Sequence, residues 1–171
     1  MKKNIILWMG AVLMLAVGMG SCSKDDEETI EPANFHVRNF ANSGCKMSLD
    51  AREMTRTTYA IDECIEYKAM KGGYLSIKHV NAVFNCEPGE LKMQATLEGN
   101  VIKILETEEQ SLANCICPYD LYCEVGPLSE GNYNIVIYKG SYQEGGEYAN
   151  LNISYKSGLD GKFDFLHPST D

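Results

Sequence analysis

Cysteine is the residue type in this chain that could take part in the widest range of chemistry. Six of the seven cysteines lie between residues 45 and 123. An even number in an oxidising compartment predicts up to three disulfides, although the sequence does not choose among the possible pairings. Cys115 and Cys117 would face the same side of one strand, about 6.5–7 Å apart, and are poorly placed to bridge each other. We therefore expect each of them to reach another strand or loop. The disulfide candidates are Cys45, Cys64, Cys86, Cys115, Cys117 and Cys123.

A metal site is the competing interpretation of the same residues. Cys115, Cys117, Cys123 and His79 carry ligand atoms that zinc prefers. Structural zinc sites, however, usually contain cysteine pairs about two to four residues apart, and disulfide formation consumes thiols. We expect no metal and no other cofactor; a metal site and partly free thiols remain the alternatives to disulfides.

The three histidines, His36, His79 and His167, lie outside the His-Glu-x-x-His and Gly-x-Ser-x-Gly motifs. His79 is the most notable, because the inward-facing positions of its strand change parity there. A bulge could turn its side chain toward a site, although a buried histidine bonded to a neighbour is the simpler interpretation. Catalysis by a cysteine would additionally need a thiol beside one of these bases.

Acidic residues are numerous, but no pair stands out as the two carboxyl groups of a glycosidase, which lie about 5–9 Å apart. Asp120 is the most interesting acid because it lies between two tyrosines in a cysteine-rich strand; the alternative is an ordinary outward-facing residue. Tyr122 and Tyr138 point away from the expected core. Exposed tyrosine suits contact with sugars or proteins, although tyrosine also simply favours strands.

Apolar and polar residues alternate with a period of two along most of the chain after residue 33, which predicts strands. The clearest case is 91–98, followed by Gly99-Asn100, a typical hairpin turn, and a returning strand. In 74–86 the parity changes between Ile77 and Val80, which predicts a bulge or bend near Lys78-His79. About eight or nine short strands separated by glycine-bearing turns favour an antiparallel β-sandwich over a closed barrel.

One short motif narrows the fold class. Leu128-x-x-Gly131-x-Tyr133 resembles the tyrosine corner of immunoglobulin-like sandwiches, in which the tyrosine hydroxyl bonds to the backbone upstream. The resemblance implies an all-β, immunoglobulin-like antiparallel β-sandwich of about 7–9 strands. Antibody domains carry a cysteine two residues after this tyrosine, whereas this chain has Ile135, so the resemblance is to the fold class and not to antibody domains.

The N-terminus predicts export. Lys2 and Lys3 precede an apolar run at 5–17, as in a secretory signal peptide. A membrane-spanning helix, the alternative, needs about 20 apolar residues. Small residues at 18, 20 and 21 precede Cys22, and this segment resembles the lipobox of bacterial lipoproteins. The resemblance implies a signal peptide at 1–21 and a lipid on Cys22, which anchors the mature chain in a membrane.

The residues after Cys22 specify the membrane. Ser-Lys-Asp-Asp-Glu-Glu at 23–28 resembles the export signal of Bacteroidetes surface lipoproteins, which implies lipid anchoring in the outer membrane at the cell surface. Residues 22–32 then form an acidic tether, and 33–171 form a single β-sandwich domain. The stretches HVNAVFNC and ANCICPYDLYCEVGPL are similar to uncharacterised small lipoproteins of the same group, from which no activity can be transferred.

The formal net charge of −9 argues against binding nucleic acid and against adhesion to anionic lipid by charge. Our first hypothesis is a non-catalytic binding module for an extracellular glycan or protein, with contacts from loops at 71–73, 128–132 and 141–147. The alternatives are an immunoglobulin-like protease inhibitor, which would present three ordered protruding loops at one end, and a hydrolase. The hydrolase would need a deep polar pocket with two acids, or His79 beside a nucleophile.

Overall fold

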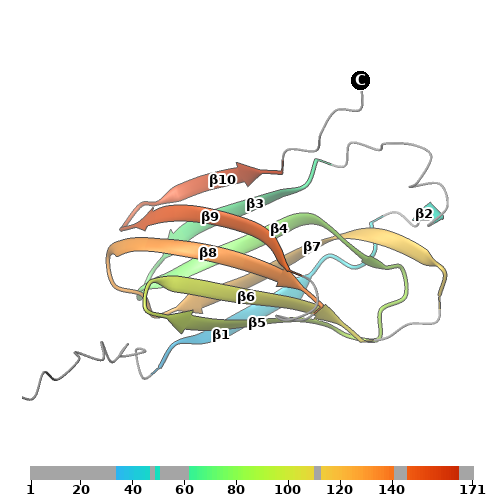
Figure 1. Cartoon of the computed structure of the whole chain (residues 1–171), viewed down its shortest axis with the longest axis horizontal. Helices are drawn as coiled ribbons and strands as arrows, with labels where there is room; N and C mark the ends of the chain where they lie inside the picture. Colours follow the sequence, from blue (N-terminus) through green and yellow to red (C-terminus); the bar gives the residue numbers. More distant parts are fainter. Residues whose placement is uncertain (1–33, 47–48, 51–61, 110–112, 141–145, 166–171) are drawn as a thin grey trace, which may run out of the picture.

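The computed structural model describes residues 34–46, 49–50, 62–109, 113–140 and 146–165 (Figure 1). These residues form two β-sheets that pack face to face, so the prediction of an all-β sandwich is confirmed. No helix able to cross a membrane is present in this part of the chain. The strands are β1 (His36–Asn42), β2 (Leu49–Asp50), β3 (Cys64–Met70), β4 (Tyr74–Asn85), β5 (Leu91–Glu98), β6 (Val101–Glu108), β7 (Cys115–Gly126), β8 (Gly131–Lys139), β9 (Glu147–Tyr155) and β10 (Asp160–Asp164).

Sheet A has the strand order β1-β7-β4-β3-β10, with the short β2 also paired to β7, and sheet B has the order β5-β6-β8-β9. The described strand pairs are antiparallel except β6–β8, which is parallel. The chain leaves sheet B after β6, runs back through β7 of sheet A, and re-enters sheet B as β8. This crossover makes β6 and β8 point the same way, which alternation along single strands does not reveal.

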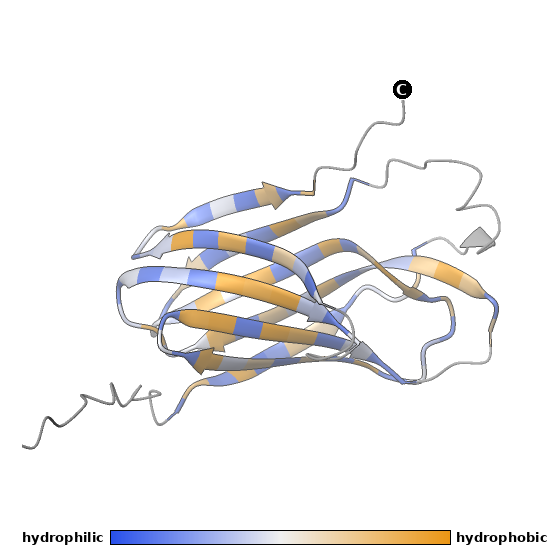
Figure 2. Ribbon diagram, in the orientation of Figure 1, coloured by the Kyte–Doolittle hydropathy of each residue, from blue (hydrophilic) through white to orange (hydrophobic). Residues whose placement is uncertain are grey.

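Side chains alternate between core and solvent along each strand, as Figure 2 shows by its alternating bands. In β5, Leu91, Met93 and Leu97 are buried while Lys92 and Gln94 are exposed, as predicted. Burying an aliphatic side chain of this size contributes about 1.5–3 kcal/mol, so the alternating pattern drives the packing of the two sheets.

The predicted bulge is present in β4. The register between β4 and β7 shifts between His79 and Ala82, and Asn81 adopts a left-handed backbone conformation with φ of 61°. The extra residue lets His79 and Ala82 both face the core, where each is fully buried. His79 thus continues the inward alternation of Leu75 and Ile77, and the bulge that follows it turns Ala82 and Phe84 inward as well.

Candidate functional site

Two of the predicted site residues lie outside the described residues: Cys22, the proposed lipid-attachment residue, and His167. The signal peptide and the acidic tether lie there too. The remaining candidates can be placed on the sandwich.

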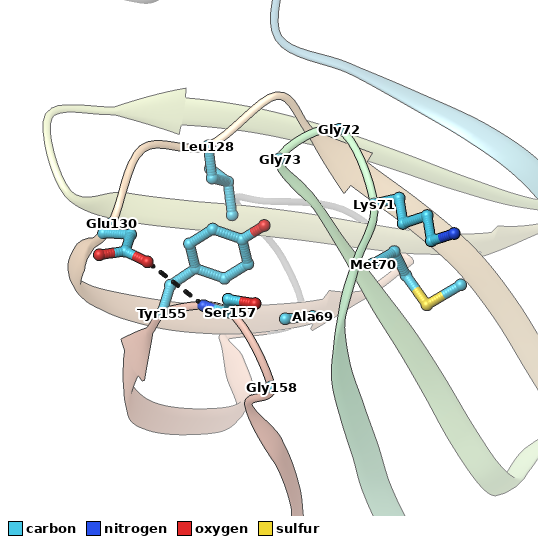
Figure 3. A pocket seen from close by; sticks show the side chains of 10 residues that line it. All are labelled: Ala69, Met70, Lys71, Gly72, Gly73, Leu128, Glu130, Tyr155, Ser157 and Gly158. Atoms are coloured by element: carbon cyan, nitrogen blue, oxygen red, sulfur yellow. Dashed lines mark hydrogen bonds between the residues drawn. The ribbon is translucent and has the colours of Figure 1, made fainter.

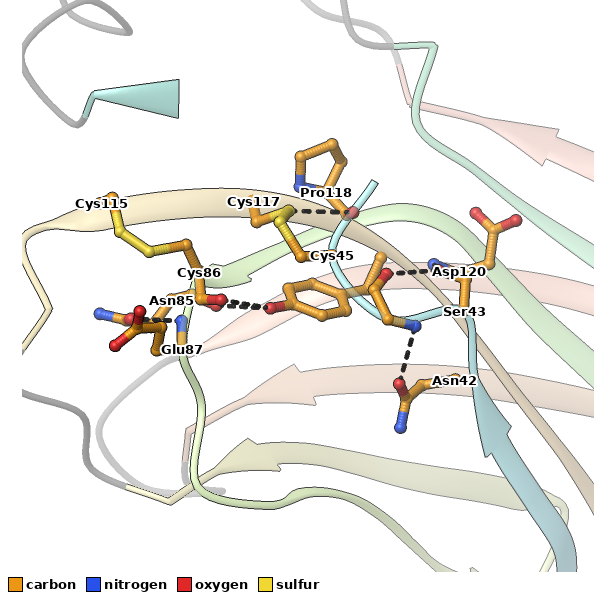
Figure 4. The surroundings of a disulfide bond; sticks show 12 residues. Asn42, Ser43, Cys45, Asn85, Cys86, Glu87, Cys115, Cys117, Pro118 and Asp120 are labelled. Atoms are coloured by element: carbon orange, nitrogen blue, oxygen red, sulfur yellow. Dashed lines mark hydrogen bonds between the residues drawn. A yellow bond between two sulfur atoms is a disulfide. The ribbon is translucent and has the colours of Figure 1, made fainter. Parts of the chain in front are cut away.

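Four of the six candidate cysteines form disulfides (Figure 4). Cys45 is bonded to Cys117 with a Cα–Cα distance of 5.6 Å, and Cys86 to Cys115 with a Cα–Cα distance of 5.5 Å. The two cysteines of β7 thus reach different partners, as predicted from their spacing on one strand. Both bonds fasten a connection to the first residues of β7, at one end of the sandwich.

Cys64 and Cys123 are buried free thiols, so two of the up to three expected disulfides are present and two of the candidate cysteines are unpaired. The two cysteines lie on β3 and β7, which flank β4, and face opposite sides of sheet A. Cys123 packs in the core, whereas Cys64 precedes the core-facing Ile65 and therefore points outward. Burial raises the pKa of Cys123 to about 12, so its thiol is not an ionised nucleophile near neutral pH.

Three of the four candidate zinc ligands are engaged in other contacts. Cys115 and Cys117 are consumed by disulfides, and His79 is bonded to carboxylates. No group of three or more His, Cys, Asp or Glu side chains arranged to hold a metal ion occurs within the described ranges.

His79 is the centre of a buried cluster of charged groups between the sheets. Its Nδ1 lies 2.9 Å from Glu106 Oε1, and its Nε2 lies 2.8 Å from Glu63 Oε1. Both ring nitrogens therefore face carboxylate oxygens, an environment that favours the protonated imidazole. Tyr148 also donates to Glu63 Oε1 at 2.6 Å, and Phe165 stacks on the His79 ring. The cluster joins groups from both sheets.

Lys139 adds a second cation beside this cluster. Its Nζ donates to the carbonyl oxygen of Val83 at 3.0 Å and lies over the rings of Phe84 and Tyr148, at 4.6 and 4.4 Å from their centroids. Burial lowers the pKa of Lys139, and attraction to Glu106 and other nearby carboxylates only partly opposes that shift. Lys139 therefore brings a second basic group close to the two carboxylates.

The pKa shifts of His79 and Glu63 favour the charged forms of both side chains. Burial opposes the charge on His79, but the charge of Glu106 and the hydrogen bonds to both carboxylates outweigh it and raise the pKa of His79 above 6.5. Burial likewise opposes ionisation of Glu63, yet hydrogen bonds from His79 and Tyr148 hold the pKa of Glu63 below 4.5. Both ring nitrogens of His79 are thus engaged with carboxylates, and neither is directed at a nucleophile. This arrangement suits stabilisation of the core.

Asp120 has a structural role at the bulge. It accepts a hydrogen bond from the backbone N–H of Asn81 at 3.1 Å, and it pairs with Lys46 and, at 3.4 Å, with Lys78. Burial opposes its ionisation, but these partners, Lys46 first, hold the pKa of Asp120 below its usual range. Asp120 therefore fastens the bulge and the connection after β1 to the outer face of sheet A.

Tyr133 makes the contact that a tyrosine corner requires. Its hydroxyl donates to the carbonyl oxygen of Ser129 at 3.0 Å, four residues upstream. Its ring lies 3.8 Å from the position that a Cβ on Gly131 would occupy, and Leu128 is buried beside them. We expect Tyr133→Phe to lower the free energy of unfolding by about 1 kcal/mol, because only the hydrogen bond is lost. Urea unfolding measures this; an unchanged stability would show that the bond contributes nothing.

Two of the three predicted contact loops meet at one end of the sandwich (Figure 3). The turn at 71–73, the connection at 128–130 and residues 155–158 surround a cavity of about 340 Å³, with the Tyr155 ring in its wall. The backbone N–H of Leu128 donates to Gly73 O at 2.7 Å, which ties the first two segments together. The loop at 141–147 joins the other ends of β8 and β9, and most of it lies outside the described residues.

The outer face of sheet A carries cross-strand rows of paired charges. In one row Arg38, Glu124, Ser76, Lys68 and Asp160 lie side by side on successive strands. Lys68 pairs with Asp160 at 2.7 Å, and Arg38 pairs with Glu124 at 2.7 Å. Such pairs each contribute little to stability when exposed, but they fix where long side chains lie.

A groove of about 530 Å³ crosses this face. It lies over β3, β4, β7 and β10, where the small side chain of Ser76 leaves room between larger neighbours. The side chains around it alternate in charge, and Tyr122 and Tyr67 are its aromatic residues. The lining residues are Glu66, Tyr67, Lys68, Ser76, Lys78, Tyr122, Asp160, Gly161 and Lys162.

The ring of Tyr122 is held in place by a chain of contacts. Its hydroxyl donates to Glu124 Oε1 at 2.9 Å, and Glu124 in turn accepts from Arg38. The Arg38 guanidinium lies 3.3 Å from the centroid of the Tyr74 ring, whose hydroxyl is 3.2 Å from His36 Nε2. Burial and the bond to Glu124 raise the pKa of Tyr122 to about 12, so the hydroxyl stays protonated and keeps donating. The ring is thus preorganised.

Tyr138 lies on the opposite side of the molecule, on the outer face of sheet B. With Thr96, Glu98 and Lys103 it lines a hollow of about 340 Å³. The prediction that Tyr122 and Tyr138 point away from the core is confirmed, and the two rings mark two separate faces.

Sequence reasoning missed the charged cluster around His79 and the groove of sheet A. The parity change drew attention to His79, but its partners Glu63, Glu106 and Tyr148 are far apart in the sequence. Comparison of the chain with protein-family models, with curated proteins and with solved structures found no match.

Proposed function

We propose that this protein is a lipid-anchored component of the bacterial outer membrane that faces outward and binds glycans, without catalysis, in the groove of sheet A. The observation that carries the proposal is the Tyr122 ring, which is held rigidly within a groove of acid–base pairs. Binding sites gain affinity when their contact groups are fixed before the ligand arrives, because less conformational entropy is then lost.

A saccharide matches the chemistry of this groove. Sugar hydroxyls donate and accept hydrogen bonds, and neighbouring ammonium and carboxylate groups such as Lys68 and Asp160 supply both functions. The apolar face of a sugar ring can pack on the ring of Tyr122. Because positive and negative groups alternate around the groove, it favours a neutral polyhydroxylated ligand over a strongly charged one.

The anchor follows from the sequence resemblance at Cys22. Eleven residues separate Cys22 from Asn34, the first described residue, and a chain of that length reaches at most about 40 Å. The sandwich would therefore stay close to the membrane while its outer faces remain open to large extracellular polymers.

The two rival functions have less support. An inhibitor of the predicted kind would present three ordered protruding loops at one end, and at the end formed by the described connections 71–73, 127–130 and 156–159 these are short. A hydrolase that uses His79 needs a free ring nitrogen, and both nitrogens contact carboxylates. A protein ligand on the same groove is the remaining candidate, and the binding experiment below distinguishes it.

Binding of purified protein to a panel of neutral and acidic polysaccharides, followed by titration calorimetry with the best ligand, tests the proposal. We expect Tyr122→Ala to weaken binding about tenfold, because the stacking surface is lost. Tyr122→Phe should have a smaller effect, since the ring remains while its bond to Glu124 is lost. Tyr138→Ala, on the opposite face, is the matched control and should bind normally.

Two results would contradict the proposal. The first is the absence of binding to any saccharide in the panel by the wild-type protein. The second is an equal loss of affinity in the Tyr122→Ala and Tyr138→Ala variants, which would place the ligand elsewhere.

A further inference from the structure

No described strand pairs with the outer side of β9, which forms one edge of sheet B. β9 pairs with β8 on one side and is the last strand of the sheet order on the other. Residues 148–155 contain no charged residue and no proline. Phe165 contacts Tyr148 at a centroid distance of 5.3 Å, so the open part of the edge is 149–155. A long, uncharged edge strand presents a row of backbone groups ready to pair with another strand.

The other sheet edges carry the usual protective features. β1 has a register shift between Arg38 and Ala41, with Asn39 in a left-handed conformation at φ 54°. β5 carries the exposed charges Lys92 and Glu98, and β10 has only five residues with three charges among them. Charges, bulges and short length all oppose edge-to-edge pairing, so β9 differs from the other described edges.

We propose that β9 pairs with β9 of a second copy of this chain, antiparallel, around a two-fold axis at Asn152. This register places Asn152 opposite Asn152, Asn150 opposite Ser154, and Leu151 opposite Ile153. Each pair then lies on one face: amides and hydroxyls outside, aliphatic side chains against the core. An isologous interface requires this kind of self-complementary surface.

A second copy suits this edge because a partner of opposite charge would find no charged residue to pair with along 149–155. The chain is acidic overall, with a formal net charge of −9, so two copies repel each other over most of their surface. Along 149–155 no charge opposes contact, and two asparagine side chains that face each other can each donate and accept. The edge is therefore the place where two identical acidic chains can approach.

The symmetry has a consequence for the groove. A two-fold axis between antiparallel strands of one continuous sheet is perpendicular to that sheet, so the outer faces of sheet A in both copies point the same way. If the proposed glycan binding is correct, the dimer presents two Tyr122 grooves on one side and gains affinity for long polymers by bivalency. The dimer itself does not depend on that function.

Charges introduced at the two-fold axis test the dimer in the purified full-length protein. We expect the wild type to sediment as a dimer in analytical ultracentrifugation, and Asn152→Lys and Asn152→Asp each to sediment as monomers, because like charges meet at the axis. Mixing the two variants should restore a dimer. Gln94→Lys, on the exposed face of β5 in the same sheet, is the matched control and should remain dimeric.

A second measurement uses whole cells. Asn152→Cys should yield a disulfide-linked dimer on non-reducing gels, whereas Gln94→Cys should not. A monomeric wild type, a mixture of the charged variants that stays monomeric, or charged single variants that stay dimeric would overturn the proposal. Tyr122→Ala should remain dimeric, so loss of glycan binding and loss of the dimer are separable.

Discussion

Replacing His79 with leucine is expected to lower the free energy of unfolding by about 3–5 kcal/mol. The imidazolium lies between Glu63 and Glu106, and both His79 and Glu106 are fully buried. Leucine has a similar volume, so the main loss is electrostatic. Two carboxylates would remain in the interior without their shared cation, and one of them would have to bind a proton or leave the core.

A double-mutant cycle separates this effect from a simple loss of packing. His79→Leu combined with Glu106→Leu removes one cation and one anion together, and an apolar pair can replace a buried ion pair at little cost. We therefore expect the double variant to be less destabilised than the sum of the single variants. Urea unfolding measures all four proteins; additive losses would show that the two side chains do not act as a pair.

The same cluster predicts a pH dependence with two limits. The pKa of His79 is raised in the folded protein, so its contribution is complete below 6.5 and is lost as pH rises through the higher folded value. The pKa of Glu63 is lowered, so its contribution is complete above 4.5 and is lost as pH falls through the lower folded value.

The expected measurement is the stability difference between the wild type and His79→Leu over a range of about pH 3–10. The difference should be largest between the two limits and should shrink on both sides. Lys139 and Tyr148 also face the cluster. Because both side chains are present in both proteins, taking the difference reduces their contribution to the measured pH dependence. A difference that stays constant across the range would contradict a charged His79.

Removing the disulfide between Cys45 and Cys117 is expected to cost about 4 kcal/mol. The two cysteines are 72 residues apart, and closing so long a loop restricts the unfolded chain strongly. The Cys86–Cys115 bond closes a loop with a separation of only 29 residues, so its removal should cost slightly less. Paired alanine variants avoid an unpaired thiol in each case.

Thermal unfolding of these variants, with and without reductant, measures both losses. The reduced wild type should be less stable than either paired variant, because both closures are then open. Cys64→Ala is the matched control. Because the Cys64 thiol is free, reductant should not change the loss of stability that this substitution causes. A paired Cys45→Ala and Cys117→Ala variant as stable as the wild type would contradict the assigned contribution.

Strands and faces could be predicted because side-chain direction alternates along any strand, whatever it pairs with. The alternation in 91–98 therefore placed Leu91, Met93 and Leu97 in the core without knowledge of β6. The parity change in 74–86 located the bulge for the same reason, since an extra residue must reverse which positions face inward.

The contact partners of individual side chains could not be predicted in this way, because they depend on the order of strands in the sheets. Cys64 and Cys123 remained candidates for a disulfide until the sheet order placed β4 between their strands and put them on opposite faces. The parallel pair β6–β8 also arises from a crossover through the other sheet. Neither feature leaves a local pattern in the chain.

Taken by itself, the sequence determined the all-β class, the inward and outward residues of the clearest strands, and the spacing argument that kept Cys115 and Cys117 from pairing with each other. All of these are local consequences of strand geometry. The tertiary structure alone decided which loops the disulfides fasten, that Glu63 and Glu106 neutralise His79, and that Tyr122 is held in a groove. Each of these joins residues distant in the chain, and such contacts exist only once two sheets of a particular strand order have packed together.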